Sequence, residues 1–181
     1  MNLTDRSSDR RFLTFAISDL SRGRLDTLPL EGSVERRPVE IFHSDMRIFD
    51  PKFSPDSRFL SYLMIDKANK MEVFVRPLIR RRLVDRGRFL QAAPARIWRR
   101  DGKELYYVAP DQAVMVADVR TSPTLSFTTP RVPFRQDAKL PDRVSYVSAD
   151  GERFLAPPPA RGPQLQQLTI FDRQGAPMQS G

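Results

Sequence analysis

The chain has 181 residues, of which 40% are hydrophobic, enough to build a core and to exclude a globally disordered protein. It contains no cysteine, which excludes disulfides, thiolate metal sites and cysteine nucleophiles. Thirty Lys and Arg residues against 22 Asp and Glu give a formal net charge of +8, which permits contact with nucleic acid or anionic lipid without requiring it.

The chain begins with a polar and charged segment, residues 1–11, that lacks the apolar stretch of a secretory signal. No later apolar run reaches the length of a membrane span. Sixteen prolines spread along the chain argue against long helices, because proline removes a backbone donor and clashes inside them. We expect many short elements and a cytoplasmic location by default, or a periplasmic one if the chain belongs to a larger exported or membrane-anchored protein.

A short motif recurs along the chain. Three clear copies begin at Ser54, Arg100 and Ser148, and a weaker copy begins at Ser8. The aspartate of the motif stands 47, 45 and 49 residues from the next one, at Asp9, Asp56, Asp101 and Asp150. A period of this size is typical of propeller blades or stacked repeats.

The residues that follow each aspartate have the spacing of a β-strand. Large apolar residues stand four positions after it, at Leu13, Leu60, Leu105 and Phe154. Six positions after it stand Phe15, Tyr62, Tyr107 and, as an exception, Ala156. Alternate side chains of a strand share one face of a sheet, so a spacing of two predicts a strand after each aspartate.

The aspartates themselves have the chemistry of tight turns. An Asp carboxylate accepts from backbone N–H groups two residues on, and glycine relieves strain at positive φ. Each copy is therefore predicted as strand, tight turn, strand. We interpret the motif residues as structural, with no role in catalysis or metal binding: Asp9, Asp56, Asp101, Gly102, Asp150 and Gly151. The first copy has Arg10 in place of glycine, and we expect it to be the least regular.

Further strands are predicted in each repeat from runs of Val, Leu, Ile and Phe. Third strands are expected at 24–30, 71–76, 113–119 and 164–171, and fourth strands at 39–42, 88–91 and 131–134. The last copy has no room for a fourth strand. The repeats then span about 7–47, 48–92, 93–140 and 141–175, within a single region 1–181.

At Pro51–Pro77, Trp98–Ala117 and Ser145–Leu155 the sequence resembles the TolB-like branch of the WD-repeat-like β-propellers. It is most similar to the propeller at the C-terminal end of bacterial serine/threonine kinases and winged-helix regulators. The resemblance implies an all-β fold, a partial β-propeller of about four TolB-like blades, each of three to four antiparallel strands. Closed propellers of this group usually have six or more blades. Four copies therefore imply an open arc with uncovered blade faces, a fragment of a larger protein, or an unusual four-blade closure.

Residues for catalysis or metal binding are not evident. The Gly-x-Ser-x-Gly elbow of serine hydrolases is absent, and so are calcium and phosphate loops. The single histidine, His43, has no cysteine partners and is interpreted as a loop residue. We predict no catalytic, cofactor-binding or metal residue. The expected function is that of a non-catalytic module for protein–protein interaction or ligand sensing, from a larger sensor or regulator, with a protein partner or covalently linked domains.

A cluster of arginines gives an alternative function. The arginines between residues 79 and 88 form a candidate anion-binding surface: Arg80, Arg81, Arg82, Arg86 and Arg88. Arg96, Arg99 and Arg100 follow shortly after, with Trp98 among them. Such a surface binds phosphates and stacks bases, which is the chemistry of nucleic acid or anionic surfaces. A solvated rim is favoured over this alternative on composition. A weaker alternative is the accessory propeller of a serine peptidase.

Overall fold

The structure is a computed structural model in which the chain divides into two compact units, residues 1–91 and 92–181. It describes residues 2–31, 37–79, 82–83, 88–91, 96–109, 111, 113–121, 125–135, 146–148, 150–156 and 169–178. All regular elements in these ranges are β-strands, and every strand pair is antiparallel. The all-β prediction is therefore confirmed.

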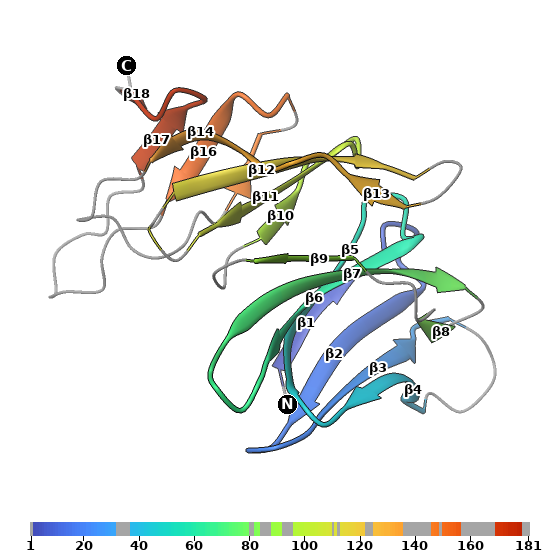
Figure 1. The fold of residues 1–181 in the computed structure, drawn as a ribbon. Coiled ribbons are helices and arrows are strands. Elements are labelled where there is room, and N and C mark those ends of the chain that lie inside the picture. The colour runs from blue at the N-terminus through green and yellow to red at the C-terminus, as the bar shows by residue number, and fades with distance from the viewer. Residues whose placement is uncertain are drawn as a thin grey trace, which may run out of the picture. The chain divides into compact units, whose positions relative to one another are not determined.

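The N-terminal unit contains two sheets (Figure 1). The strands of the first sheet are adjacent in chain order: β1 (Asn2–Arg6), β2 (Phe12–Ser18), β3 (Gly23–Pro29) and β4 (Val39–Ser44). The second sheet has β5 (Arg47–Phe53), β6 (Phe59–Ile65) and β7 (Met71–Ile79), with β8 (Arg82–Leu83) and β9 (Arg88–Gln91) both paired to β7.

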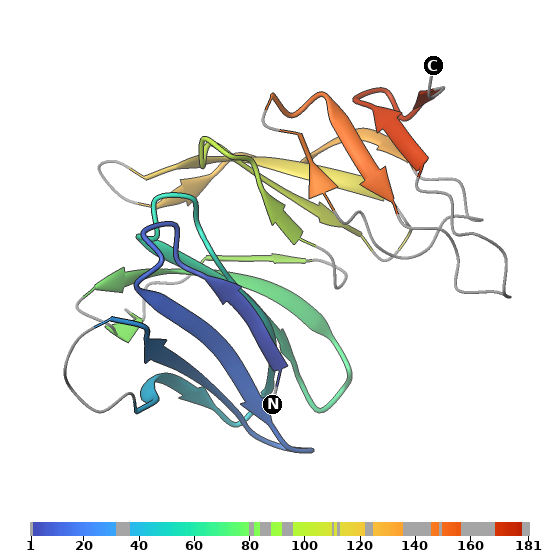
Figure 2. The same cartoon turned by 180° about the vertical axis from the view of Figure 1, so that it is seen from behind.

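The C-terminal unit repeats this plan, and Figure 2 shows the unit from behind. The third sheet has β10 (Arg96–Trp98), β11 (Glu104–Val108) and β12 (Ala113–Arg120), with β13 (Ser126–Phe127) and β14 (Arg131–Arg135) both paired to β12. The fourth sheet has β15 (Tyr146–Val147), β16 (Arg153–Ala156), β17 (Thr169–Asp172) and β18 (Pro177–Met178).

Each sheet has two faces that we name from the turn aspartate. The incoming face carries the residue four positions after it, and the outgoing face carries the residue five positions after it, because side chains alternate along a strand. In the N-terminal unit, Ala16 and Leu25 on the outgoing face of the first sheet pack against Leu60 and Tyr62 on the incoming face of the second. Such packing buries apolar area at about 25 cal/mol per Å².

The C-terminal unit packs in the same way. Tyr106 and Val116 on the outgoing face of the third sheet contact Phe154 on the incoming face of the fourth. The rings of Tyr106 and Phe154 meet edge to face, with centroids 5.3 Å apart. Each of these two interfaces is therefore formed by an outgoing face and the next incoming face along the chain.

Two expectations about the ends of the chain are wrong. The first copy of the motif is regular, since it opens a complete sheet of four strands. The last copy does have a fourth strand, β18, paired with β17. It fits because the carboxylate of Asp172 accepts the backbone N–H groups of Gln174 and Ala176, and Gly175 adopts φ 82°. This tight turn returns the chain within a few residues.

Candidate functional site

The four predicted turns share one backbone geometry. Two backbone hydrogen bonds close each turn, as Asp56 illustrates. Ser54, two residues before the aspartate, donates its N–H to the carbonyl of Phe59, three residues after the aspartate. The carbonyl of Ser54 in turn accepts the N–H of Ser57, the residue that follows the aspartate, and the other three copies have the same pair of bonds. The residue following the aspartate has positive φ in every copy: Arg10 at 62°, Ser57 at 56°, Gly102 at 73° and Gly151 at 77°. The turn therefore favours glycine at this position, which two of the four copies provide.

The aspartate side chain stabilises the turn by hydrogen bonds within it. In three copies a serine hydroxyl two residues earlier donates to it: Ser7 to Asp9 at 2.6 Å, Ser54 to Asp56 at 2.6 Å, and Ser148 to Asp150. The same carboxylate also accepts the backbone N–H of the residue two positions on. These contacts account for the carboxylates, so we interpret the turn aspartates as structural.

The third turn replaces the serine by an arginine. Arg99 donates to both carboxylate oxygens of Asp101, at 2.8 and 2.5 Å. This pairing with Arg99 lowers the pKa of Asp101 to about 2. Hydrogen bonds from Ser7 and Ser148 likewise lower the pKa values of Asp9 and Asp150.

The pKa of Asp101 predicts a loss of stability in acid. A free Asp titrates near pH 3.9, so its folded pKa lies below its unfolded one. The ionised Asp101 therefore contributes fully to the stability of the folded state above about pH 4, and this contribution is lost as the pH falls toward 2. Denaturation followed by the fluorescence of Trp98, which lies in the same unit, should show stability falling through this range. Asp101→Asn should flatten that fall, and an unchanged pH profile would contradict the assignment.

The first turn holds a non-glycine residue at positive φ. Arg10 adopts φ 62°, a conformation that costs a residue with a side chain about 1–2 kcal/mol. Glycine avoids this cost but loses more backbone entropy on folding, which offsets part of the gain. Arg10→Gly should therefore raise the free energy of unfolding by about 0.5 kcal/mol. The measurement is urea denaturation, with Arg11→Gly as the control, which should destabilise.

A buried carboxylate joins the two sheets of the C-terminal unit. The side chain of Glu104 is 8% exposed and accepts from Arg99 at 3.0 Å, Arg131 at 2.9 Å and the hydroxyl of Tyr106 at 2.5 Å. Arg173, in the turn between β17 and β18, lies 3.5 Å from the same carboxylate. Burial, with help from Glu104, raises the pKa of Tyr106 above its ordinary value.

The surrounding charges are balanced by further acids. Arg131 also donates to Asp118 at 2.9 Å, and Arg173 donates to Glu152 at 2.7 Å. Gly151 lies against this group, since a Cβ there would stand 2.8 Å from the Tyr106 hydroxyl. With its charges paired, this cluster ties the third sheet to the fourth, which indicates a structural role.

The predicted arginine surface is not described in full. Arg80, Arg81 and Arg86 lie outside the described residues, and Arg82 and Arg88 are described as strand backbone in β8 and β9. Arg99, which the sequence placed beside this surface, pairs with Asp101 and Glu104. The anion-binding hypothesis therefore stays a prediction.

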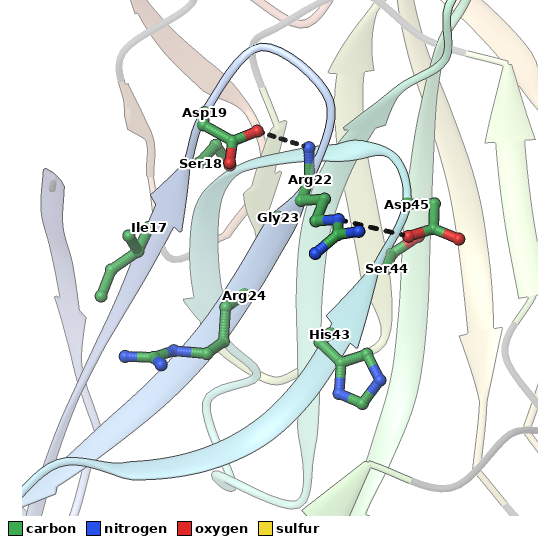
Figure 3. A pocket seen from close by; sticks show the side chains of 9 residues that line it. All are labelled: Ile17, Ser18, Asp19, Arg22, Gly23, Arg24, His43, Ser44 and Asp45. Atoms are coloured by element: carbon green, nitrogen blue, oxygen red, sulfur yellow. Dashed lines mark hydrogen bonds and ion pairs between the residues drawn. The ribbon is translucent and has the colours of Figure 1, made fainter.

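A pocket of about 590 Å³ lies at one end of the first sheet (Figure 3). Its floor is a row of cross-strand neighbours, Ile17 on β2, Arg24 on β3 and His43 on β4, all on the incoming face. The remaining lining comes from the ends of β2, β3 and β4 and from the turns that follow β2 and β4: Ser18, Asp19, Arg22, Gly23, Ser44 and Asp45. His43, which the sequence places at the end of the expected strand 39–42, is the last residue but one of β4.

The pocket carries charges of both signs. Arg22 lies 3.9 Å from Asp45, and both side chains are exposed. His43 Nδ1 lies 2.8 Å from Glu40, and Arg24 donates to the buried Asp26 at 2.8 Å. Among the described residues no group of three or more His, Cys, Asp or Glu side chains is arranged to hold a metal ion. The pocket therefore offers polar contacts of both charges.

The β2–β3 turn that forms one wall is fixed by its own hydrogen bonds. Asp19 accepts the backbone N–H groups of Ser21 and Arg22 at 2.7 and 2.8 Å, which lowers its pKa. Sequence reasoning missed Asp19 and Arg22, although an aspartate stands ten residues after the turn aspartate in three repeats, at Asp19, Asp66 and Asp111. The turn pattern of Asp19 with Gly23 shortly after it was the available signal.

The first and fourth sheets each leave one face partly uncovered. On the outgoing face we compare the third-strand residue that pairs with the fifth residue after the aspartate. This residue is buried in the first three sheets, as Thr27 (2% exposed), Val75 (0%) and Val116 (0%). In the fourth sheet it is Ile170, which is 42% exposed. On the incoming face, Leu60, Leu105 and Phe154 are at most 1% exposed, whereas Leu13 is partly exposed. The exposure of equivalent positions thus differs in the first and fourth sheets.

Met178 extends the uncovered patch of the fourth sheet. It pairs with Ile170 and is 46% exposed, and Leu155, which pairs with Ile170 from the other side, is partly exposed. We name Leu155, Ile170 and Met178 the terminal patch. Three apolar side chains in one cross-strand row present the same kind of surface that the third sheet buries.

No protein-family model matches the sequence, and a search of curated proteins finds no match. Solved structures do match. TolB from Acinetobacter baumannii aligns over 100% of this chain and 44% of its own, with 14% identity and a TM-score of 0.59. The Cps50 (Swd1) β-propeller domain of Myceliophteria thermophila aligns over 98% of this chain and 72% of its own, with 13% identity and a TM-score of 0.57.

A third match is the periplasmic gluconolactonase PpgL of Pseudomonas aeruginosa, over 97% of this chain and 55% of its own, with 19% identity and a TM-score of 0.58. The chain thus spans about half the length of TolB and of PpgL. These similarities show the fold: four sheets of a TolB-like and WD-repeat-like β-propeller, present as a partial propeller.

Proposed function

We propose that this partial propeller is a non-catalytic interaction module that binds a protein partner through an apolar sheet face. The exposure of Ile170, at 42% where its equivalents are at most 2% exposed, is the observation that carries the proposal. Propeller and WD40 folds serve as rigid scaffolds for binding, which supports the same function. Within the described residues there is no helix long and apolar enough to cross a membrane.

An apolar dye tests whether the terminal patch is a binding surface. In dilute solution, a dye that fluoresces on apolar surfaces should bind the wild-type chain, and Ile170→Glu should lower that signal more than Val132→Glu does. Val132→Glu is the matched control, because Val132 is 45% exposed in the same unit and lies outside the patch. Equal dye binding by the two variants would contradict the proposal.

The proposal includes the absence of enzymatic activity. PpgL is named a gluconolactonase, so lactone hydrolysis is the reaction to assay first. We expect no hydrolysis of gluconolactone above the rate in buffer. A saturable rate that is lost when His43 is replaced by alanine would overturn this part of the proposal.

The pocket favours a second candidate function, the sensing of a small polar ligand. Its volume of about 590 Å³ falls within the range of small-molecule sites, and its lining includes Arg22, His43 and Asp45. A thermal-shift screen of small polar metabolites tests it. A ligand should raise the melting temperature of the wild-type chain and leave an Arg22→Ala, His43→Ala variant unchanged.

A further inference from the structure

We propose that the partner covering the terminal patch is a second copy of this chain, which docks there with the incoming face of its first sheet. The inference rests on the proposed function and specifies its partner. It is a head-to-tail contact, in which two different surfaces of the same chain meet.

The kind of surface required is set by the two interfaces inside the chain. In each, an outgoing face packs on an incoming face of the next sheet. The terminal patch is an outgoing face, so its complement is an incoming face with apolar residues at the fourth and sixth positions after a turn aspartate. Leu13 and Phe15 of the first sheet have these positions.

The first sheet is the one whose incoming face has spare surface. Leu13 and Ile17 on β2 and Leu28 on β3 are partly exposed, although Phe15 between them is buried. Leu13 and Leu28 are direct cross-strand neighbours, and Ile17 borders the pocket. A sheet placed on this face would cover three apolar side chains and, toward the pocket, would lie beside Arg24 and His43.

Each copy of the chain carries both surfaces that such a contact needs, the terminal patch and the incoming face of the first sheet. A contact between unlike surfaces either closes between copies or continues into longer assemblies. Both the closed and the open assembly require an intact terminal patch and an intact first sheet.

Sedimentation velocity over a wide range of concentration tests the inference. The wild-type chain should associate as concentration rises, and Ile170→Glu should weaken association by about a hundredfold or more, because a carboxylate would be buried against leucine. Leu13→Glu should do the same from the other side. Val132→Glu and Val39→Glu are the exposed apolar controls and should associate like the wild type.

A mixture of the two variants tests whether the contact joins unlike surfaces. Ile170→Glu copies keep their first sheet and Leu13→Glu copies keep their patch, so the mixture should associate although neither variant does alone. A monomeric wild-type chain, association that Ile170→Glu leaves unchanged, or a mixture that stays monomeric would each overturn the inference. Dye binding lost in Ile170→Glu with a monomeric wild type would leave the proposed function standing with another partner.

Discussion

Glu104→Gln is expected to lower the free energy of unfolding of the C-terminal unit by about 3 kcal/mol, because it removes the charge that three arginines share. The side chain of Glu104 is 8% exposed, so the arginines facing it would lose a partner that water replaces poorly. Partial exposure of Arg131 and Arg173 keeps the expected loss toward the low end of the range for broken buried pairs.

Trp98 is the chain's single tryptophan and lies in β10, so its fluorescence reports on the unit that contains Glu104. Denaturant unfolding followed by this signal is the measurement. Glu152→Gln is the matched control, because Glu152 is half-exposed and pairs with Arg173 at the surface, where one ion pair contributes about 0–1 kcal/mol. Equal losses for the two variants would show that Glu104 does not hold the sheets together.

Gly23→Ala is expected to destabilise the N-terminal unit by about 1–3 kcal/mol or more, as overpacked sites do. A Cβ at Gly23 would lie 2.5 Å from the backbone nitrogen of Ile48 and 2.7 Å from the carbonyl oxygen of Met46. Backbone atoms cannot rotate away as side chains do, so β3 and β5 would have to separate. Ser18 bridges the same place, donating to the Ile48 carbonyl at 2.6 Å and accepting its N–H at 2.9 Å.

The effect of Gly23→Ala is measured by circular dichroism during thermal unfolding, since Trp98 lies in the other unit. Ser21→Ala is the control two residues away. It removes one exposed hydrogen bond to Asp19 and should change stability little. A Gly23→Ala chain as stable as the wild type would mean that β3 and β5 are not held as closely as the structure has them.

The repeat predicted most of the strand order because turn and strand chemistry are local. Asp56 and Asp150 sit in serine-braced turns, and the alternation after them places Leu60 and Phe154 on buried faces. The fourth strand of the last copy was missed because only four residues connect β17 to β18, fewer than lead to β4, β9 or β14 in the earlier copies. Gly175 was its signal in the sequence.

The terminal patch and the pocket were harder to predict from the sequence, because each depends on which sheet faces are covered by a neighbouring sheet or turn. Ile170 and Val116 are both β-branched residues in third strands, and the sequence assigns them the same environment. Their exposure differs because a sheet packs on one and not on the other. The pocket likewise joins Arg22 and Asp45, which lie in separate turns and whose approach requires the pairing of β3 with β4.

The exposure of the terminal patch can be measured directly, because the chain contains no cysteine of its own. Cysteines placed singly at residues 116 and 170 occupy equivalent positions of two sheets, and their reaction rates with a small thiol reagent in dilute solution report access. The residue-170 thiol should react at least about tenfold faster, since buried thiols are inert. Equal rates would contradict an apolar face left open on the fourth sheet.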